Sequence, residues 1–114
     1  MKKIITVAII AMMLVVNCVP ASANSLTFSH GNDNGSKKCF AKTSQTGTDS
    51  IGALITWQLS GSNKVVYGSV ANSTGYSAKS SSKSLSGKSG KSFGYFYHNG
   101  SEVRRSAAWY SFSF

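Results

Sequence analysis

Apolar and polar residues alternate along residues 51–59 with the period of a β-strand. Ile51, Ala53, Ile55, Trp57 and Leu59 fall on one face, and Gly52, Leu54, Thr56 and Gln58 fall on the other. One apolar and one mixed face indicate a central strand. Shorter runs bounded by turn-forming residues predict further strands at residues 25–30, 38–44 and 64–70. The short link at residues 61–63 predicts a hairpin between the strands at 51–59 and 64–70.

The C-terminal residues predict a second hairpin. Asn99-Gly100 is a pair that tolerates positive φ at both centres of a type I′ turn. A two-residue loop there pairs His98 with Ser101, Tyr97 with Glu102, Phe96 with Val103, Tyr95 with Arg104 and Phe93 with Ser106. Because opposed residues share a face, one side would carry Phe93, Tyr95, Tyr97, Glu102, Arg104, Ala108, Tyr110, Phe112 and Phe114. The other side would carry Phe96, Val103, Arg105, Ala107 and Trp109.

The segment Ser77–Ser92 is rich in Ser and Lys and contains no acidic residue. Its composition favours a flexible linker, but that linker would join only a terminal hairpin, which is marginally stable alone. The preferred interpretation is a solvated strand from about Tyr76 to Leu85, with Tyr76, Ala78 and Leu85 touching the core, and a mobile loop at Ser86–Ser92. Helical spacing is missing after residue 23. The sequence therefore predicts an all-β fold, a small antiparallel β-sandwich with a C-terminal aromatic hairpin.

The N-terminal residues have the order of a secretory signal. Lys2 and Lys3 precede the apolar run Ile4–Val16, and the small residues Ala21-Ser22-Ala23 follow. The apolar run is shorter than the about 20 residues that span a bilayer, and Asn17 before Cys18 does not fit a lipoprotein signal. We predict cleavage between Ala23 and Asn24, with a signal peptide at residues 1–23 and a single secreted, extracellular β domain at residues 24–114.

Removal of the signal leaves a strongly basic domain with one cysteine. Ten Lys and Arg residues remain against three acidic residues, a formal net charge of +7. Cys39 has no partner within the domain. Burial is the preferred interpretation because free cysteines are often buried. A Cys39-linked dimer is the second interpretation, and a thiol activated by Lys37 and Lys38 is the third.

The remaining groups do not form a catalytic or metal motif. Two histidines, His30 and His98, and three acidic residues are scattered along the domain, and a Ser-His-Asp set is expected by chance in a serine-rich chain. One cysteine and two distant histidines do not make a zinc framework, and the loop at Asp33 has one carboxylate where a calcium loop uses several. We therefore predict no catalytic activity, no metal and no cofactor. Nucleic acid is not expected as a partner because the domain is exported and carries no recognised binding motif.

Basic charge together with aromatic residues indicates binding to an anionic cell-wall polymer or membrane surface. The residues predicted for this contact are Lys79, Lys83, Lys88, Lys91, Arg104 and Arg105. Trp57, Trp109 and Tyr110 could stack on sugars or sit at a lipid interface. The alternative interpretation places the aromatic residues in the core and leaves the lysines as solubilising groups.

The segment YHNGSEVRRSAAW, with its Tyr97-His98, Gly100-Ser101 and Ser106-Ala107 pairs, is similar to a stretch that the lactococcin family of secreted bacteriocins carries nearer the N-terminus. The signal, the small basic chain and the aromatic terminal strand also resemble that family. The resemblance implies a small all-β protein that acts on the envelope of related bacteria, and it assigns no site residue. The leading expectation is a secreted, cationic, non-enzymatic, bacteriocin-like or antimicrobial protein. The alternative is a structural or adhesive surface protein that binds wall polymers or glycans, with Cys39 as a link between chains.

Overall fold

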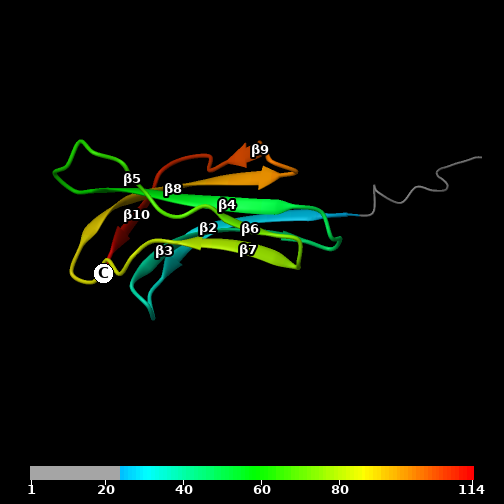
Figure 1. Ribbon diagram of the computed structural model, residues 1–114. Helices are drawn as coiled ribbons and strands as arrows, with labels where there is room; N and C mark the ends of the chain where they lie inside the picture. The colour runs from blue at the N-terminus through cyan, green and yellow to red at the C-terminus, as the bar shows by residue number, and fades with distance from the viewer. Residues whose placement is uncertain (1–23) are drawn as a thin grey trace, which may run out of the picture.

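The computed structural model describes residues 24–114, which form two antiparallel β-sheets and no helix (Figure 1). The smaller sheet has the order β2 (Leu26–Asp33), β3 (Lys38–Gln45) and β7 (Ser77–Ser81). The larger sheet contains β4 (Ile51–Leu59), β5 (Val66–Tyr67), β6 (Ala71–Ser73), β8 (Ser89–His98), β9 (Ser101–Arg105) and β10 (Tyr110–Ser113). The all-β prediction is confirmed. The predicted signal peptide and the Ala23 side of its cleavage site lie outside the described residues.

Strand β4 is the centre of the larger sheet, as its alternation predicted. It pairs with β8 over its whole length and with β5 and β6 along its other edge. Its inward face joins a core cluster made of Cys39, Ala41, Ala53, Ile55, Trp57, Leu85, Phe96 and Phe112. Trp57 is only 3% exposed, so the hypothesis that it stacks on a ligand is wrong. Burial of this large apolar ring between the sheets stabilises the folded protein.

The two sheets lie face to face, with the larger sheet above the smaller one in Figure 1. A hydrogen bond joins them where the Thr43 hydroxyl on β3 donates to the Gly52 carbonyl oxygen on β4 at 2.7 Å. The rings of Phe28 on β2 and Phe96 on β8 pack across the interface with centroids 5.3 Å apart. The larger sheet is wider than the smaller one. In the larger sheet β9 and β10 lie beyond β8, whereas the smaller sheet ends at β2 on that side.

The β8–β9 hairpin has the predicted turn but a different register. Asn99 and Gly100 have φ values of 53° and 82°, as a type I′ turn requires, and Tyr97 pairs with Glu102 as predicted. A β-bulge then shifts the register, so that Phe96 pairs with Arg104 and Tyr95 with Arg105. The predicted pairs of Phe96 with Val103 and Tyr95 with Arg104 are wrong because the bulge leaves Val103 as an extra residue on β9. Arg104 and Arg105 consequently exchange faces relative to the prediction.

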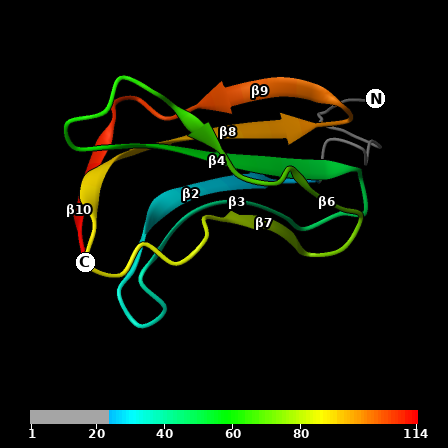
Figure 2. The same ribbon diagram turned by 60° about the vertical axis from the view of Figure 1, so that its left-hand side comes forward.

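The last residues do not continue the hairpin. The backbone N–H of Ser106 donates to the Gly94 carbonyl oxygen at 2.9 Å, whereas the prediction paired Ser106 with Phe93. The chain then bends, and β10 pairs with the beginning of β8, with Tyr110 opposite Ser92 and Phe112 opposite Gly90 (Figure 2). Tyr110 and Phe112 thus lie on the inward side, and Phe112 is buried. The bend also places Trp109 beside Phe93 on the outward side, so the predicted faces of Trp109, Tyr110 and Phe112 are wrong, whereas Phe93 shares a face with Tyr95 and Tyr97 as predicted.

The lysine-rich segment is more ordered than its composition indicated. Strand β7 ends at Ser81, and β8 begins at Ser89, so Lys91 lies in a strand and not in the predicted loop. Leu85 anchors the connection between them, because its side chain is buried and its N–H donates to the Lys37 carbonyl oxygen at 2.8 Å. Ala78 is buried as predicted, but Tyr76 is 74% exposed. The predicted strand at 64–70 is likewise shortened to β5, which still pairs with β4 as a hairpin.

Candidate functional site

Strand β8 carries half-buried aromatic rings at three alternate positions of its outward side. Phe93, Tyr95 and Tyr97 point away from the core because Ser92, Gly94 and Phe96, which alternate with them, are buried. Their neighbours on β4 are Thr56, Leu54 and Gly52, which are shorter than the rings. Tyr67 on β5 lies opposite Thr56 and is 63% exposed. Rings on two strands therefore cover one outward side of the larger sheet.

We call this surface the aromatic face and define it as Tyr67, Phe93, Tyr95, Tyr97 and Trp109 with Lys91 and Arg105. The ring of Phe93 is its centre. Phe93 lies 5.3 Å from Tyr95 in an edge-on arrangement and 5.3 Å from Trp109 in a tilted one. Trp109 is 38% exposed. These contacts hold the rings of the row in fixed relative positions while part of each ring stays open to solvent.

Two cations lie against these rings. The Lys91 ammonium is 5.2 Å from the centre of the Trp109 ring, and the Arg105 guanidinium is 5.3 Å from that of Tyr95. Arg105 Nε also donates to the Glu102 carboxylate at 2.7 Å, and this hydrogen bond raises the pKa of Arg105. Burial, followed by the charge of Glu102, raises the pKa of Tyr97. The aromatic face thus combines rings with positive charge in a defined geometry.

A second outward surface lies on the smaller sheet. We call it the basic face and define it as Lys38, Phe40, Lys42 and Lys79. Lys42 on β3 stands directly opposite Lys79 on β7, and the Lys79 ammonium is 4.9 Å from the centre of the Phe40 ring. Asp33 lies opposite Lys38. The pKa of Asp33 is lowered mainly by hydrogen bonds from Ser36, and the charge of Lys79 makes the smallest contribution. Sequence reasoning missed Lys42 because strand pairing, not sequence proximity, brings it opposite Lys79, and it missed Lys38, which lies on the same side of β3 two residues before Phe40.

The structure distributes the predicted polyanion-binding residues over several surfaces. Lys79 lies on the basic face, and Lys91 and Arg105 lie on the aromatic face. Lys83 and Lys88 are exposed in the connection between β7 and β8. Arg104 lies on the other side of β9, over the ring of Phe28 at 5.2 Å. These residues form no single loop cluster.

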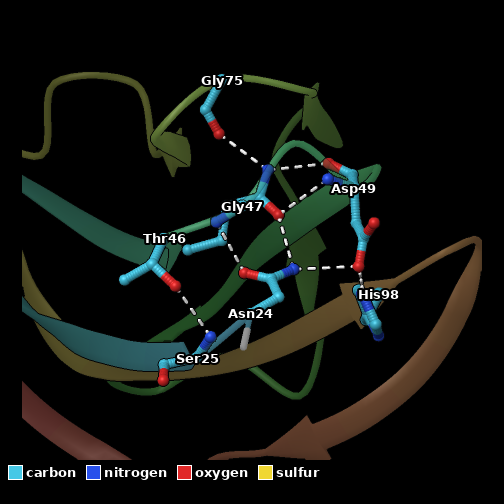
Figure 3. A network of polar contacts seen from close by, with 8 residues as sticks. Asn24, Ser25, Thr46, Gly47, Asp49, Gly75 and His98 are labelled. Carbon is cyan, nitrogen blue, oxygen red and sulfur yellow. Dashed lines mark hydrogen bonds and ion pairs between the residues drawn. The ribbon is translucent and has the colours of Figure 1, made fainter. Parts of the chain in front are cut away.

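A polar network at the end of the two sheets involves Asp49 and His98 (Figure 3). His98 Nε2 and Asn24 Nδ2 both lie 2.9 Å from Asp49 Oδ2, and these hydrogen bonds, His98 first, lower the pKa of Asp49. Asn24, the predicted first residue after signal cleavage, also bonds Gln45 Oε1 at 3.0 Å through Nδ2 and accepts from the Gly47 N–H at 2.8 Å. Gln45 Nε2 donates to the carbonyl oxygens of Asp49 and Gly75 at 2.7 and 2.8 Å. The network joins Asn24, which precedes β2, to the end of β3, to the loop that follows β3 and, through Asp49, to the end of β8. A structural role, holding these segments together, explains each of these contacts.

His30 has hydroxyl partners on both ring nitrogens. Nε2 lies 2.9 Å from Ser92 Oγ, and Nδ1 lies 3.0 Å from Ser106 Oγ. A Ser-His-Asp triad would place a carboxylate at one of these positions, and here both are occupied by serine. Among residues 24–114, no group of three or more His, Cys, Asp or Glu side chains is arranged to hold a metal ion. These residues also contain no helix that is long and apolar enough to cross a membrane.

Cys39 is completely buried between the sheets. Its thiol donates to Asn32 Oδ1 at 3.7 Å, and burial raises its pKa. The interpretation of Cys39 as a buried thiol agrees with this position. A disulfide with a second chain stays a prediction, and it would require the sheets to separate around Cys39.

Comparison with known proteins found no matching family model, no matching curated protein and no matching solved structure. The arguments on function therefore rest on the geometry of these surfaces.

Proposed function

We propose that residues 24–114 form a secreted β-sandwich that binds anionic glycans of the bacterial envelope through the aromatic face, without catalysis. The observation that carries this proposal is the row of partly exposed rings along β8 with Lys91 and Arg105 held against it. Exposed rings gathered on one surface are a feature of interaction sites, whereas scattered ones need no explanation.

The chemistry of the aromatic face suits a sugar polymer. Aromatic rings offer an apolar surface for the C–H faces of sugar rings, and Tyr hydroxyls at the rim can hydrogen-bond sugar hydroxyls. Alternate residues of a strand lie about 6.6 Å apart and neighbouring strands about 4.8 Å apart, so Phe93, Tyr95 and Tyr97 form a line along which successive sugar units can lie. Lys91, Arg105 and the net positive charge of the domain attract anionic substituents, and salt weakens that attraction.

Such binding would serve one of two biological uses. The resemblance to the lactococcin family supports a bacteriocin-like, antimicrobial protein. The alternative is a structural or adhesive surface protein that binds wall polymers or glycans. The lysines of the β7–β8 connection and the basic face assist long-range attraction in both cases.

The test is sedimentation of the purified secreted protein with intact bacterial cells and isolated walls across a salt series, with growth inhibition measured on the same cells. We expect binding that weakens with salt. Binding with killing supports the bacteriocin-like use, and binding without killing supports the adhesive use. Absence of binding to both cells and walls would overturn the proposal.

A matched pair of variants locates the contact. Tyr95→Ala combined with Trp109→Ala should weaken binding by at least about ten-fold, because two stacking surfaces are removed. Tyr76→Ala removes an exposed ring outside the aromatic face and should change binding by less than about two-fold. Substitution of Lys79, Lys83, Lys88 and Lys91 by Gln should mainly reduce the salt dependence. Equal loss in the Tyr76 variant would move the contact away from the aromatic face.

A further inference from the structure

A groove of about 480 Å³ lies on the inward side of the larger sheet, where that sheet extends past β2. Its lining includes Phe28, His30, Phe96, Arg104, Ser106 and Tyr110, and Arg105 of the aromatic face also lines it. The groove is on the opposite side of β8 from the aromatic face, because Phe96 alternates with Tyr95 and Tyr97 along that strand. Its volume falls within the range of small-ligand sites.

The β-bulge in the hairpin supplies the groove with a cation. By shifting the register, it turns Arg104 inward, where the guanidinium lies 5.2 Å from the centre of the Phe28 ring. Phe28 in turn packs against Phe96 in a tilted arrangement, so the ring under Arg104 is itself held in place. The ion pair in this hairpin is made by Arg105 with Glu102. Within residues 24–114, neither a hydrogen bond nor an ion pair engages the Arg104 guanidinium.

The floor of the groove is neutral and ordered. Ser106 Oγ accepts the Gly94 N–H at 2.9 Å, so its own proton can be donated to His30 Nδ1 at 3.0 Å. His30 Nε2 then carries the ring proton and donates to Ser92 Oγ at 2.9 Å. Burial lowers the pKa of His30, which favours the uncharged ring in neutral solution. No carboxylate lines the groove, so the charge of its wall comes from Arg104 and from Arg105, of which Arg105 is paired with Glu102.

The groove also has an exposed ring for an apolar or sugar surface. Tyr110 is 52% exposed, and its ring meets the edge of His30 with centroids 5.8 Å apart. The Arg104 guanidinium lies over the Phe28 ring, and its planar fork of N–H groups matches the two oxygens of a carboxylate or phosphate. An oxyanion on a small ring is therefore complementary in charge and shape to Arg104 and Tyr110 together.

We propose that this groove is a second binding site, for a small sugar that carries an oxyanion, either a carboxylate or a phosphate. Arg104 binds the oxyanion through its N–H groups, and Tyr110 packs against the sugar ring. The site shares Arg105 with the aromatic face, but it contains neither Tyr95 nor Trp109, the rings whose removal tests glycan binding by that face.

The test is an NMR titration of the ¹⁵N-labelled secreted protein with glucuronate, glucose 1-phosphate and uncharged glucose at millimolar concentrations. We expect shift changes at the Arg104 side chain, His30 and Tyr110 with at least one of the two anions, and far weaker changes with glucose. The Arg104→Gln variant should bind that anion at least about ten-fold more weakly, as expected for loss of a charge-assisted hydrogen bond. The affinity of Arg104→Lys, which keeps the charge but not the planar fork of N–H groups, should lie between those of the original protein and Arg104→Gln.

Lys64→Gln is the matched control, because Lys64 is exposed in the β4–β5 connection and carries the same charge. It should leave anion binding within about two-fold of the original value. A response to glucuronate alone identifies a carboxylate ligand, and a response to glucose 1-phosphate alone identifies a phosphate ligand. The proposal is overturned if neither anion shifts the groove residues, if glucose shifts them equally, or if a well-folded Arg104→Gln protein binds as before. Loss of wall binding in the aromatic-face variants would not change these titrations, so the two proposals can fail separately.

Discussion

The outward sides of the two sheets both carry exposed cations, but they surround these cations with different neighbours. The aromatic face of the larger sheet surrounds its cations with rings and has Glu102 as a partner for Arg105. The basic face of the smaller sheet has one ring, Phe40, and sets Lys42 directly opposite Lys79. Like charges opposed on neighbouring strands destabilise a sheet. The difference shows that positive charge alone does not locate a binding site in this protein, because most lysines lie where few rings accompany them.

The largest expected effect separates the two tryptophans. Trp57 is buried in the core and Trp109 lies on the aromatic face. Trp57→Ala should lower the free energy of unfolding by about 3–5 kcal/mol, because it leaves a cavity between the sheets. Trp109→Ala should lower it by less than about 1 kcal/mol, since its ring is partly exposed. Urea denaturation followed by circular dichroism measures both.

The contrast between the tryptophans would collapse if Trp109→Ala destabilised the protein as much as Trp57→Ala. Trp109 would then be a structural residue, and loss of wall binding in its variants could not be assigned to a ligand contact. Tyr76→Ala serves as the exposed aromatic control for stability as it does for binding.

The next largest effect is the change of stability with pH. Neither outward face should cause it, because His30 and His98 both lie on the inward side of their strands. Burial holds the pKa of His30 below 6.5 in the folded protein. The unfolded chain therefore takes up a proton first as the pH falls, and stability present above about pH 6.5 is lost below it. Asp49 acts in a lower window, since its depressed pKa makes stability fall as the pH drops through and below 3.8.

Urea midpoints between pH 7.5 and pH 3 test this assignment. His30→Gln should remove the decline that begins near pH 6.5, and Asp49→Asn should reduce the decline near pH 4, to which Asp33 also contributes, while leaving the upper one. If the His30 variant keeps the full upper decline, another group is responsible. Wall binding by the aromatic face should stay constant across the upper window as long as the protein is folded.

The sequence predicted those parts of the fold in which local chemistry and alternation agree. The alternation of β4 identified the central strand, and Asn99-Gly100 identified the turn, because positive φ at both positions restricts the residues that fit. The bulge at Val103 could not be predicted. A shift by one residue exchanges Arg104 for Arg105 and leaves aromatic residues on both sides of β8, so the hydrophobic pattern does not distinguish the two registers.

The candidate sites were less accessible to sequence reasoning for the same reason. Phe93, Tyr95 and Tyr97 were expected on one face, but Trp109 joins them only because the chain bends after Ser106. The groove around Arg104 exists because of the bulge, and the lysines opposed on the basic face belong to strands far apart in the sequence. Strand pairing over long separations determines all of these contacts, and it is weakly encoded in any local window.

The smallest expected effect distinguishes the faces by its sign. Lys42→Ser removes one of two opposed lysines from the basic face and should stabilise the protein slightly, by less than about 1 kcal/mol. Arg105→Ser removes a cation that contacts Tyr95 and Glu102 and should destabilise it. Thermal unfolding at low salt measures both, and added salt should shrink the gain from Lys42→Ser because it screens the repulsion. The two signs together are the informative result, since both substitutions replace a cation by Ser on the outward side of a strand. If both variants are destabilised equally, the opposed lysines are not repulsive in the folded protein, and the basic face would then have to be regarded as a second surface organised around its ring, Phe40, as the aromatic face is organised around Phe93.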